Sequence, residues 1–154
     1  MNSFVNDLLP NEKVLAISKK NWTLFINAKN IIGIIIALIF LFIFPPLSII
    51  ILGVTMIPTV LEYMNTELVL TNMRLRGKQG AFHIRTVENK ASYFIGNFKT
   101  HSNVILNSLG SDTIIIQSAG VAPFVFSHMK NAKAMSNALY SLGTSNEVQV
   151  VNKI

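Results

Sequence analysis

The sequence has no cysteine among its 154 residues, and charged residues make up only 13% of it. Without a thiol, the chain has no disulfide framework, no thiolate nucleophile and no cysteine-based metal site. Soluble domains carry roughly 25% charged residues, about twice the fraction seen here. The apolar fraction, by contrast, is 51%. Such a composition favours a chain that places much of its length outside water, and it leaves the redox compartment open.

The sequence is also poor in groups that could carry out chemistry. None of the seven carboxylates has a second one at a spacing that would aim both from one helix face. The three histidines, His83, His101 and His128, are scattered and show no metal-ligand spacing. Glycine-rich phosphate loops and nucleophile elbows are missing. We therefore expect no catalytic residue, no metal and no cofactor, and we predict that the chain is not an enzyme.

One long stretch, residues 31–61, contains no charge at all. A helix crosses the roughly 30 Å core of a bilayer with about 20 residues, so this stretch is too long for one span and short for two. Pro45 and Pro46 lie near its middle, where a continuous helix would lose a hydrogen bond and clash with its preceding turn. The sequence therefore predicts a two-helix transmembrane hairpin over residues 30–61 that turns at Phe44 to Ser48.

The two arms of this hairpin need extension at the membrane surface, because each spans only about 21–23 Å at 1.5 Å per residue. The first can extend back to Trp22 with Lys29 snorkelling, and the second can extend forward to Tyr63. These three residues are the predicted membrane interface. The arms are mostly Ile, Leu and Phe, and we expect no small-xxx-small seam between helices. Two buried helices in a soluble core, or a re-entrant loop that does not cross, are the alternatives.

The basic residues lie on both sides of the hairpin and are missing from its turn. By the positive-inside rule, both termini should lie in the cytoplasm and the turn outside. This predicts a two-span protein of the cell membrane, preceded by a cytoplasmic tail over residues 1–29.

From Glu62 onward, continuous hydrophobicity gives way to short alternating segments separated by turn residues. Seven strands are predicted, over residues 66–71, 73–78, 81–87, 91–98, 104–109, 113–118 and 123–127. Residues 128–142 switch to three- and four-residue spacing, which predicts an amphipathic helix capped by Ser127 and ended by Gly143. Residues 144–154 are predicted to be a flexible tail. The predicted class is α+β, a seven-stranded sandwich or barrel with a C-terminal helix covering one end.

Three segments carry a family resemblance: NTELVLTNMRLRGKQG, SLGSDTIIIQSAG and FVFSHMKNAKAMSNAL. Together with NEKVL and the apolar hairpin before them, they make residues 10–142 similar to bacterial pleckstrin-homology-like proteins with membrane-flanked domains. The resemblance implies a PH-like barrel over residues 62–143, capped by the terminal helix and held at a bacterial membrane.

One basic constellation is a candidate binding site. Arg74, Arg76 and Lys78 alternate along a predicted strand and so share a face, which Arg85 of the next strand could join. Near anionic headgroups, each such residue contributes on the order of 1 kcal/mol. An ordinary solvated strand face is the alternative. Nucleic acid is a poorer fit, because the net charge of +6 comes without a basic helix or stacking aromatics.

The resulting hypothesis is a non-enzymatic, membrane-anchored interaction or assembly module on the cytoplasmic face. Its expected partners are membrane lipids together with another protein or a second copy of the chain. The alternative is an accessory subunit of a membrane transport or export complex that acts through its hairpin.

Overall fold

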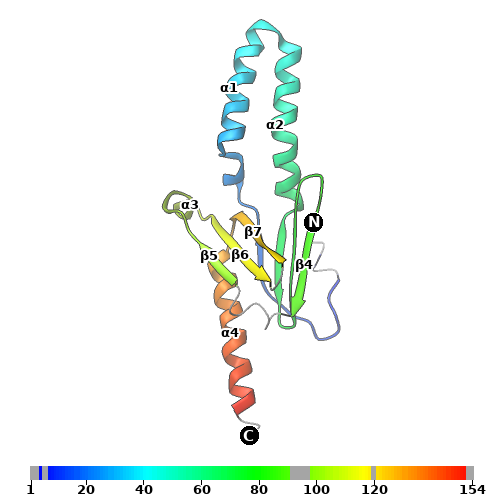
Figure 1. Ribbon diagram of the computed structural model, residues 1–154, viewed down its shortest axis with the longest axis vertical. Coiled ribbons are helices and arrows are strands. Elements are labelled where there is room, and N and C mark those ends of the chain that lie inside the picture. The colour runs from blue at the N-terminus through cyan, green and yellow to red at the C-terminus, as the bar shows by residue number, and fades with distance from the viewer. Residues whose placement is uncertain (1–3, 5–6, 91–97, 119–120, 152–154) are drawn as a thin grey trace.

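The computed structural model describes residue 4 and residues 7–90, 98–118 and 121–151. A helical hairpin stands at one end, and two sheets with a long helix form the other (Figure 1). The elements in chain order are β1 (Val14–Lys19), the 3₁₀ helix η1 (Trp22–Phe25), α1 (Ala28–Ile43), α2 (Pro45–Asn65), β2 (Glu67–Thr71), β3 (Arg74–Gln79), β4 (Arg85–Lys90), β5 (Phe98–His101), α3 (Val104–Ser108), β6 (Asp112–Ser118), β7 (Val121–Met129) and α4 (Ala132–Val151).

Within the described residues, seven strands form two antiparallel sheets. One sheet has the order β1-β2-β3-β4 and the other the order β5-β6-β7. The two meet where β1 and β7 end: Lys20 forms a bridge with Met129, and the Lys130 amide donates to the Lys19 carbonyl at 2.8 Å. The expected α+β class with a C-terminal helix is therefore confirmed. Seven strands were expected after Glu62, but six of the seven lie there and the other, β1, precedes the hairpin.

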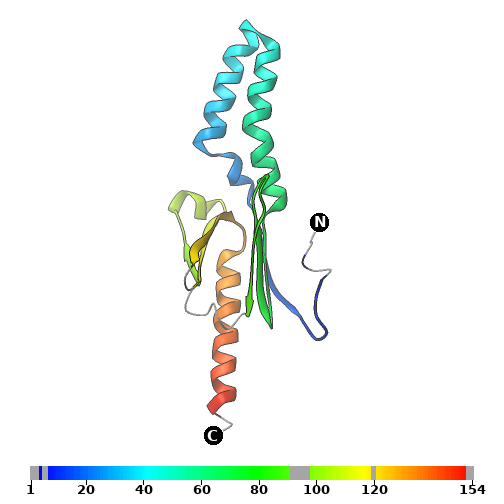
Figure 2. The same ribbon diagram turned by 45° about the vertical axis from the view of Figure 1, so that its right-hand side comes forward.

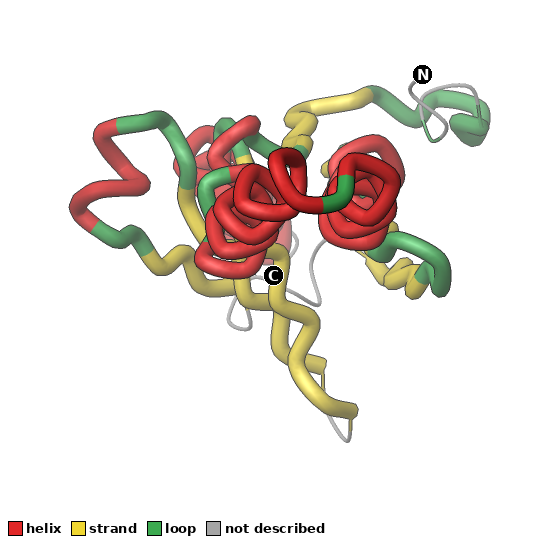
Figure 3. Tube along the Cα trace, turned by 90° about the horizontal axis from the view of Figure 1, so that it is seen from above, coloured by secondary structure: helices red, strands yellow, loops and turns green. Residues whose placement is uncertain are grey.

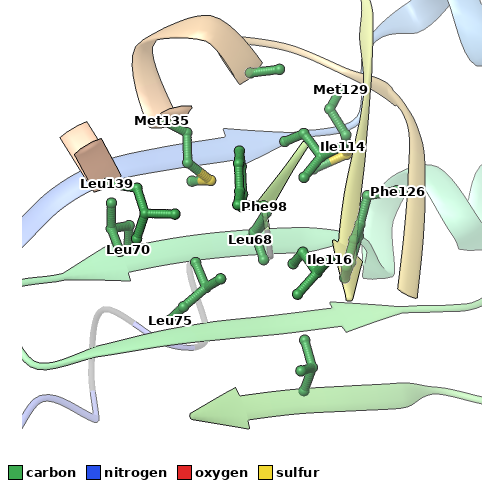
Figure 4. Close-up of a cluster of buried hydrophobic side chains, with 12 residues drawn as sticks. Leu68, Leu70, Leu75, Phe98, Ile114, Ile116, Phe126, Met129, Met135 and Leu139 are labelled. Carbon is green, nitrogen blue, oxygen red and sulfur yellow. The ribbon is translucent and has the colours of Figure 1, made fainter. Parts of the chain in front are cut away.

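The hydrophobic core lies between the two sheets and the first turns of α4 (Figure 4). Its side chains come from strands β2 to β7 and from α4, and the largest fully buried ones are Phe98, Phe126, Leu68, Leu70, Leu75, Ile114, Ile116, Met129, Met135 and Leu139. Gly77 lies in the middle of this packing. A Cβ there would stand 2.7 Å from Leu68 Cδ1 and 2.9 Å from Phe126 Cζ, so the core requires a residue without a side chain.

The helical hairpin is an insertion in the first β-hairpin of this domain. β1 leads into it and β2 leads out of it, and the ends of the two strands are paired, Lys19 with Glu67. Only Phe44 separates α1 from α2, and Pro45 takes the first position of α2, where its missing N–H costs nothing. The predicted turn at the proline pair is confirmed. Because both arms start from neighbouring strands, they leave the β-domain at the same place (Figure 2).

Pairing between β1 and β2 changes the expected domain division. Residues 1–29 were predicted to be a tail outside the β-domain, yet β1 within them pairs along β2. The β-domain therefore contains residues from both sides of the hairpin. A six-residue segment gives little indication by itself that its partner strand lies beyond two helices.

Two predicted strands are placed differently in the structure. Residues 104–109 were expected to be a strand, but Val104–Ser108 is helical, and Asn103 caps it by accepting from the Ile105 amide at 3.2 Å. A short apolar run cannot distinguish helix from strand by its periodicity. The strand expected from residue 81 begins at Arg85, because a turn that starts at Gly80 (φ +144°) occupies the intervening positions. The strand expected at 91–98 falls mainly outside the described residues.

The bounds predicted for the C-terminal helix were also wrong. His128 and Met129 belong to β7, so Ser127 caps nothing, and α4 starts at Ala132 with the Met135 amide donating to the Asn131 carbonyl. Gly143 lies inside the helix, which continues to Val151. A helical glycine costs only about 1 kcal/mol relative to alanine, too little to stop a helix by itself. Most of the predicted flexible tail is therefore helical.

Candidate functional site

The hairpin has its small and polar residues inside and its large apolar residues outside. The buried residues of α1 are Asn30, Gly33 and Ala37, and those of α2 are Ser48 and Thr59. Its most exposed side chains are apolar, including Phe42 at 89% and Ile49 at 71%. Helices of a soluble domain show the opposite arrangement. An exposed apolar surface of this extent is typical of a region that contacts a membrane or another protein.

The two arms contact each other through small residues. A Cβ on Gly33 would lie 2.5 Å from Thr55 Cγ2, so glycine permits this close approach. One turn nearer the domain, the Thr59 hydroxyl donates to Asn30 Oδ1 at 3.1 Å. The expectation that the arms lack a small-xxx-small seam is wrong, because Gly33 and Ala37 stand four residues apart and both face the partner helix. The signal was present in the sequence, hidden among isoleucines.

The lengths of the two helices differ. α2 has 21 residues and, among the described residues, is the one helix long and apolar enough to cross a membrane by length and composition. α1 is apolar but has 16 residues. At 1.5 Å per residue the helices are about 32 and 24 Å long.

The predicted interface residues all lie at the base of this hairpin. Trp22 is exposed in η1, Lys29 is exposed in the first turn of α1, and Tyr63 is in the last turn of α2. The rings of Phe25 and Tyr63 contact each other with centroids 5.6 Å apart. The three predicted residues therefore lie at the same end of the hairpin, although they come from two separate segments of the sequence. Their contact with lipid stays a prediction.

A polar cluster joins the hairpin to the sheets, and we call it the junction cluster. At its centre is the fully buried ammonium group of Lys20, 2.9 Å from Glu62 Oε1 and 2.7 Å from the Ser127 carbonyl oxygen. A second set of bonds runs beside it, in which the Thr23 hydroxyl donates to Ser111 Oγ at 2.9 Å and lies 3.1 Å from His128 Nδ1. Its members are Lys20, Asn21, Thr23, Glu62, Ser111, Ser127 and His128.

Burial governs protonation in the junction cluster. It lowers the pKa of Lys20, and the hydrogen bond and charge of Glu62 act in the opposite direction. Burial also lowers the pKa of His128, helped by the charge of Lys20. Asn21 completes the cluster by donating its amide to the carbonyls of Leu109 and Gly110, at 3.0 Å each. The cluster ties α2, η1 and β7 together around the end of β1.

A second charged cluster lies on the outer face of the first sheet. Arg74 donates to both carboxylate oxygens of Glu12, at 2.9 and 3.0 Å, and also to Glu88. Arg76 donates to Asp7 Oδ2 at 2.9 Å and to Glu88 Oε2 at 3.1 Å. The Phe4 ring stacks over Arg76 with its centroid 4.6 Å away. We call this group, Phe4, Asp7, Glu12, Arg74, Arg76 and Glu88, the arginine cluster.

The cations of the arginine cluster are paired within the chain, because its two guanidinium groups contact three carboxylates. The hydrogen bond between Glu12 and Arg74 is the main cause that lowers the pKa of Glu12, to about 2. The same hydrogen bond raises the pKa of Arg74. Both guanidinium groups therefore already contact carboxylates contributed by the residues before β1. The sequence showed the alternating cations but not their partners before β1, Glu12 and Asp7, which are 62 and 69 positions away from Arg74 and Arg76.

The predicted headgroup residues are divided between the two faces of the sheet. Lys78 is on the face of the arginine cluster, and its nitrogen lies 5.7 Å from the Phe4 ring centroid. Arg85 pairs with Gln79, the residue after Lys78. Because neighbouring residues of a strand point to opposite faces, Arg85 lies on the face opposite Lys78. The expectation that Arg85 joins the other three is wrong. It instead lines a hollow of about 630 Å³ with residues that include Glu62, His83 and Phe124.

The part of the chain that the structure describes holds no group of three or more histidines and carboxylates that could bind a metal ion. Of the three histidines, only His128 has a partner described above, in the junction cluster. His83 and His101 are exposed, the first in the β3–β4 turn and the second at the end of β5.

The fold is that of a small two-sheet β-domain with a C-terminal helix, interrupted by a helical hairpin. The sequence model of the bacterial PH domain matches residues 24–143, more than three quarters of the chain. The chain therefore belongs to the bacterial PH domain family. No curated protein and no solved structure matches it. PH-like domains are binding and interaction modules, and this is the class of function that the family supports.

Proposed function

We propose that the chain is a non-enzymatic, membrane-anchored interaction module. In this proposal α1 and α2 both cross the bacterial cell membrane, the termini lie in the cytoplasm, and the PH-like domain is held at the inner lipid surface. There it binds a protein partner or a second copy of the chain.

A single observation carries the anchoring, namely the reversed burial of the hairpin. Its buried small and polar side chains lie in the contact between α1 and α2, and its outer surface consists mainly of Ile, Leu and Phe. Such a surface suits lipid on all sides. This also disfavours the accessory-subunit alternative, since the small-residue seam already serves the partner arm.

Anionic headgroups are the second part of the proposal, and Arg85 is their first candidate. It begins β4 at the hairpin end of the domain, whereas Arg74 begins β3, five residues before Gln79. At 3.3 Å per residue, Arg74 lies about 17 Å farther from that end. Replacing Arg85 with glutamine should reduce the rise in unfolding temperature when anionic lipid is added to neutral nanodiscs. An equal rise in the wild type and the variant would exclude this contact.

The absence of cysteine makes a labelling experiment direct. Phe44→Cys places a thiol at the turn of the hairpin, and Asn137→Cys places one on the exposed face of α4. In intact cells, a membrane-impermeant maleimide should label position 44 alone. Position 137 should react only after the cells are permeabilised.

Other labelling patterns contradict the proposal in distinct ways. Labelling of neither position before permeabilisation means a re-entrant hairpin or no insertion. Labelling of position 137 alone in intact cells would show that the topology is the reverse of the proposed one. Extraction of the wild-type protein into buffer without detergent would contradict membrane anchoring.

A further inference from the structure

Outside the hairpin, the most exposed large apolar side chains of the described residues belong to two short segments. Phe82 in the β3–β4 turn is 76% exposed, and Val104 and Ile105 in α3 are 85% and 71% exposed. Among the residues whose burial the structure describes, every other large apolar side chain outside the hairpin is close to half exposed or less. We call Phe82, Ile84, Val104 and Ile105 the apolar tips.

The two segments lie on opposite sides of the hairpin and at the level of its base. Figure 1 shows α3 beside the start of α1, and the β3–β4 turn rising alongside the end of α2. From above, α3 and this turn project in different directions from the pair of helices (Figure 3). Trp22 in η1 and Ile26 directly after it are each 49% exposed.

Local structure exposes these side chains for identifiable reasons. Gly80 adopts φ +144°, and a Cβ there would lie 2.0 Å from the His83 carbonyl oxygen, so the turn folds tightly and projects Phe82 outward. In α3, no residue is buried, and the helix follows directly from its Asn103 cap. Neither segment therefore contributes to the core, and each exposes at least one large apolar side chain by more than 70%.

We infer that the apolar tips dock into the lipid surface around the hairpin and hold the β-domain against the membrane on two sides of the hairpin. This inference rests on the proposed anchoring. The occupant is lipid because the tips continue the apolar surface of the hairpin at its base, and because a flat surface is what two segments on opposite sides of it can reach together. Interfacial apolar side chains of this kind enter the boundary between headgroups and acyl chains.

The inference is tested with the full chain in vesicles of phosphatidylethanolamine and phosphatidylglycerol. Single cysteines at Phe82 and Ile105 carry an environment-sensitive dye, and the vesicles contain lipid spin-labelled near the headgroup. Fluorescence at positions 82 and 105 should be quenched. Met73→Cys is the matched control, since Met73 is an exposed apolar turn residue at the opposite end of β3, and its dye should remain unquenched.

Val54→Cys, in the exposed middle of α2, separates this inference from the proposed function. Deeply spin-labelled lipid should quench its dye if the hairpin is inserted. Quenching at position 54 without quenching at 82 and 105 overturns lipid docking and leaves the anchoring intact. No quenching at position 54 overturns both. Protection of positions 82 and 105 from aqueous iodide, without quenching by lipid, assigns the tips to a protein partner and also overturns lipid docking.

Discussion

Single charged residues in this protein form ion pairs with residues far away in the sequence. Glu12 is buried, and it accepts from Arg74, Thr71 and the Leu9 amide. Arg74 is thereby held together with the residues that precede β1. A face of the sheet that reads as basic in the sequence is, in three dimensions, a mixed cluster of guanidinium and carboxylate groups.

The low pKa of Glu12 predicts a loss of stability in acid. Because folding lowers this pKa from 4.5 to about 2, the carboxylate contributes stability above pH 4.5, and this contribution is lost as the pH falls toward 2. Glu12→Gln should be less stable than the wild type at pH 7 and should lose less stability across that range. Urea unfolding in detergent at a series of pH values measures both effects. Identical slopes for the two proteins would contradict the assignment.

At the scale of elements, the hairpin depends on close approach of α1 and α2. Gly33 permits this approach, whereas Gly53 on α2 has nothing nearer than Ile57 Cδ1 at 3.7 Å. The same substitution at the two positions therefore separates helix packing from helix propensity.

Gly33→Ala should destabilise the hairpin by about 1–3 kcal/mol, because the added methyl group overlaps Thr55 and forces the helices apart. Gly53→Ala should cause no loss, since its methyl group meets only ordinary contacts and alanine favours a helix. Thermal unfolding in detergent micelles compares the two variants. Equal midpoints would mean that the arms do not pack through Gly33.

At the scale of the whole molecule, the hairpin and the β-domain are coupled by more than chain connection. Lys20 is fully buried between Glu62 of α2 and Ser127 of β7, so it holds elements of both parts in one position. The PH-like domain thus has a defined orientation relative to the hairpin axis.

Lys20→Ala should weaken this coupling. Removing one partner of a buried ion pair costs up to roughly 3–5 kcal/mol, and we expect about 2 kcal/mol because Glu62 remains partly exposed. The distance distribution between spin labels at Phe44 and Asn137 should broaden as the domain loses its fixed orientation. Lys133→Ala is the control, since Lys133 makes one exposed bond to Asn107 and should change neither quantity. An unchanged distribution in Lys20→Ala would show that the chain connections alone fix the orientation.

The sequence by itself determined the local features of this protein. A charge-free run with two central prolines was sufficient to predict the hairpin and its turn, because helix continuation depends on neighbouring residues only. Alternation likewise predicted β2, β3 and β6.

Only the tertiary structure decided which distant segments meet. β1 pairs with β2 across the whole hairpin, Glu12 reaches Arg74, and the register of β3 with β4 sends Arg85 to the opposite face. Strand register and ion pairing depend on contacts between residues far apart in the chain, and a one-residue shift reverses the face of every side chain. The local sequence pattern does not indicate those contacts. The partners of Arg74 and Arg76 and the buried position of Lys20 could therefore be seen only in the folded molecule.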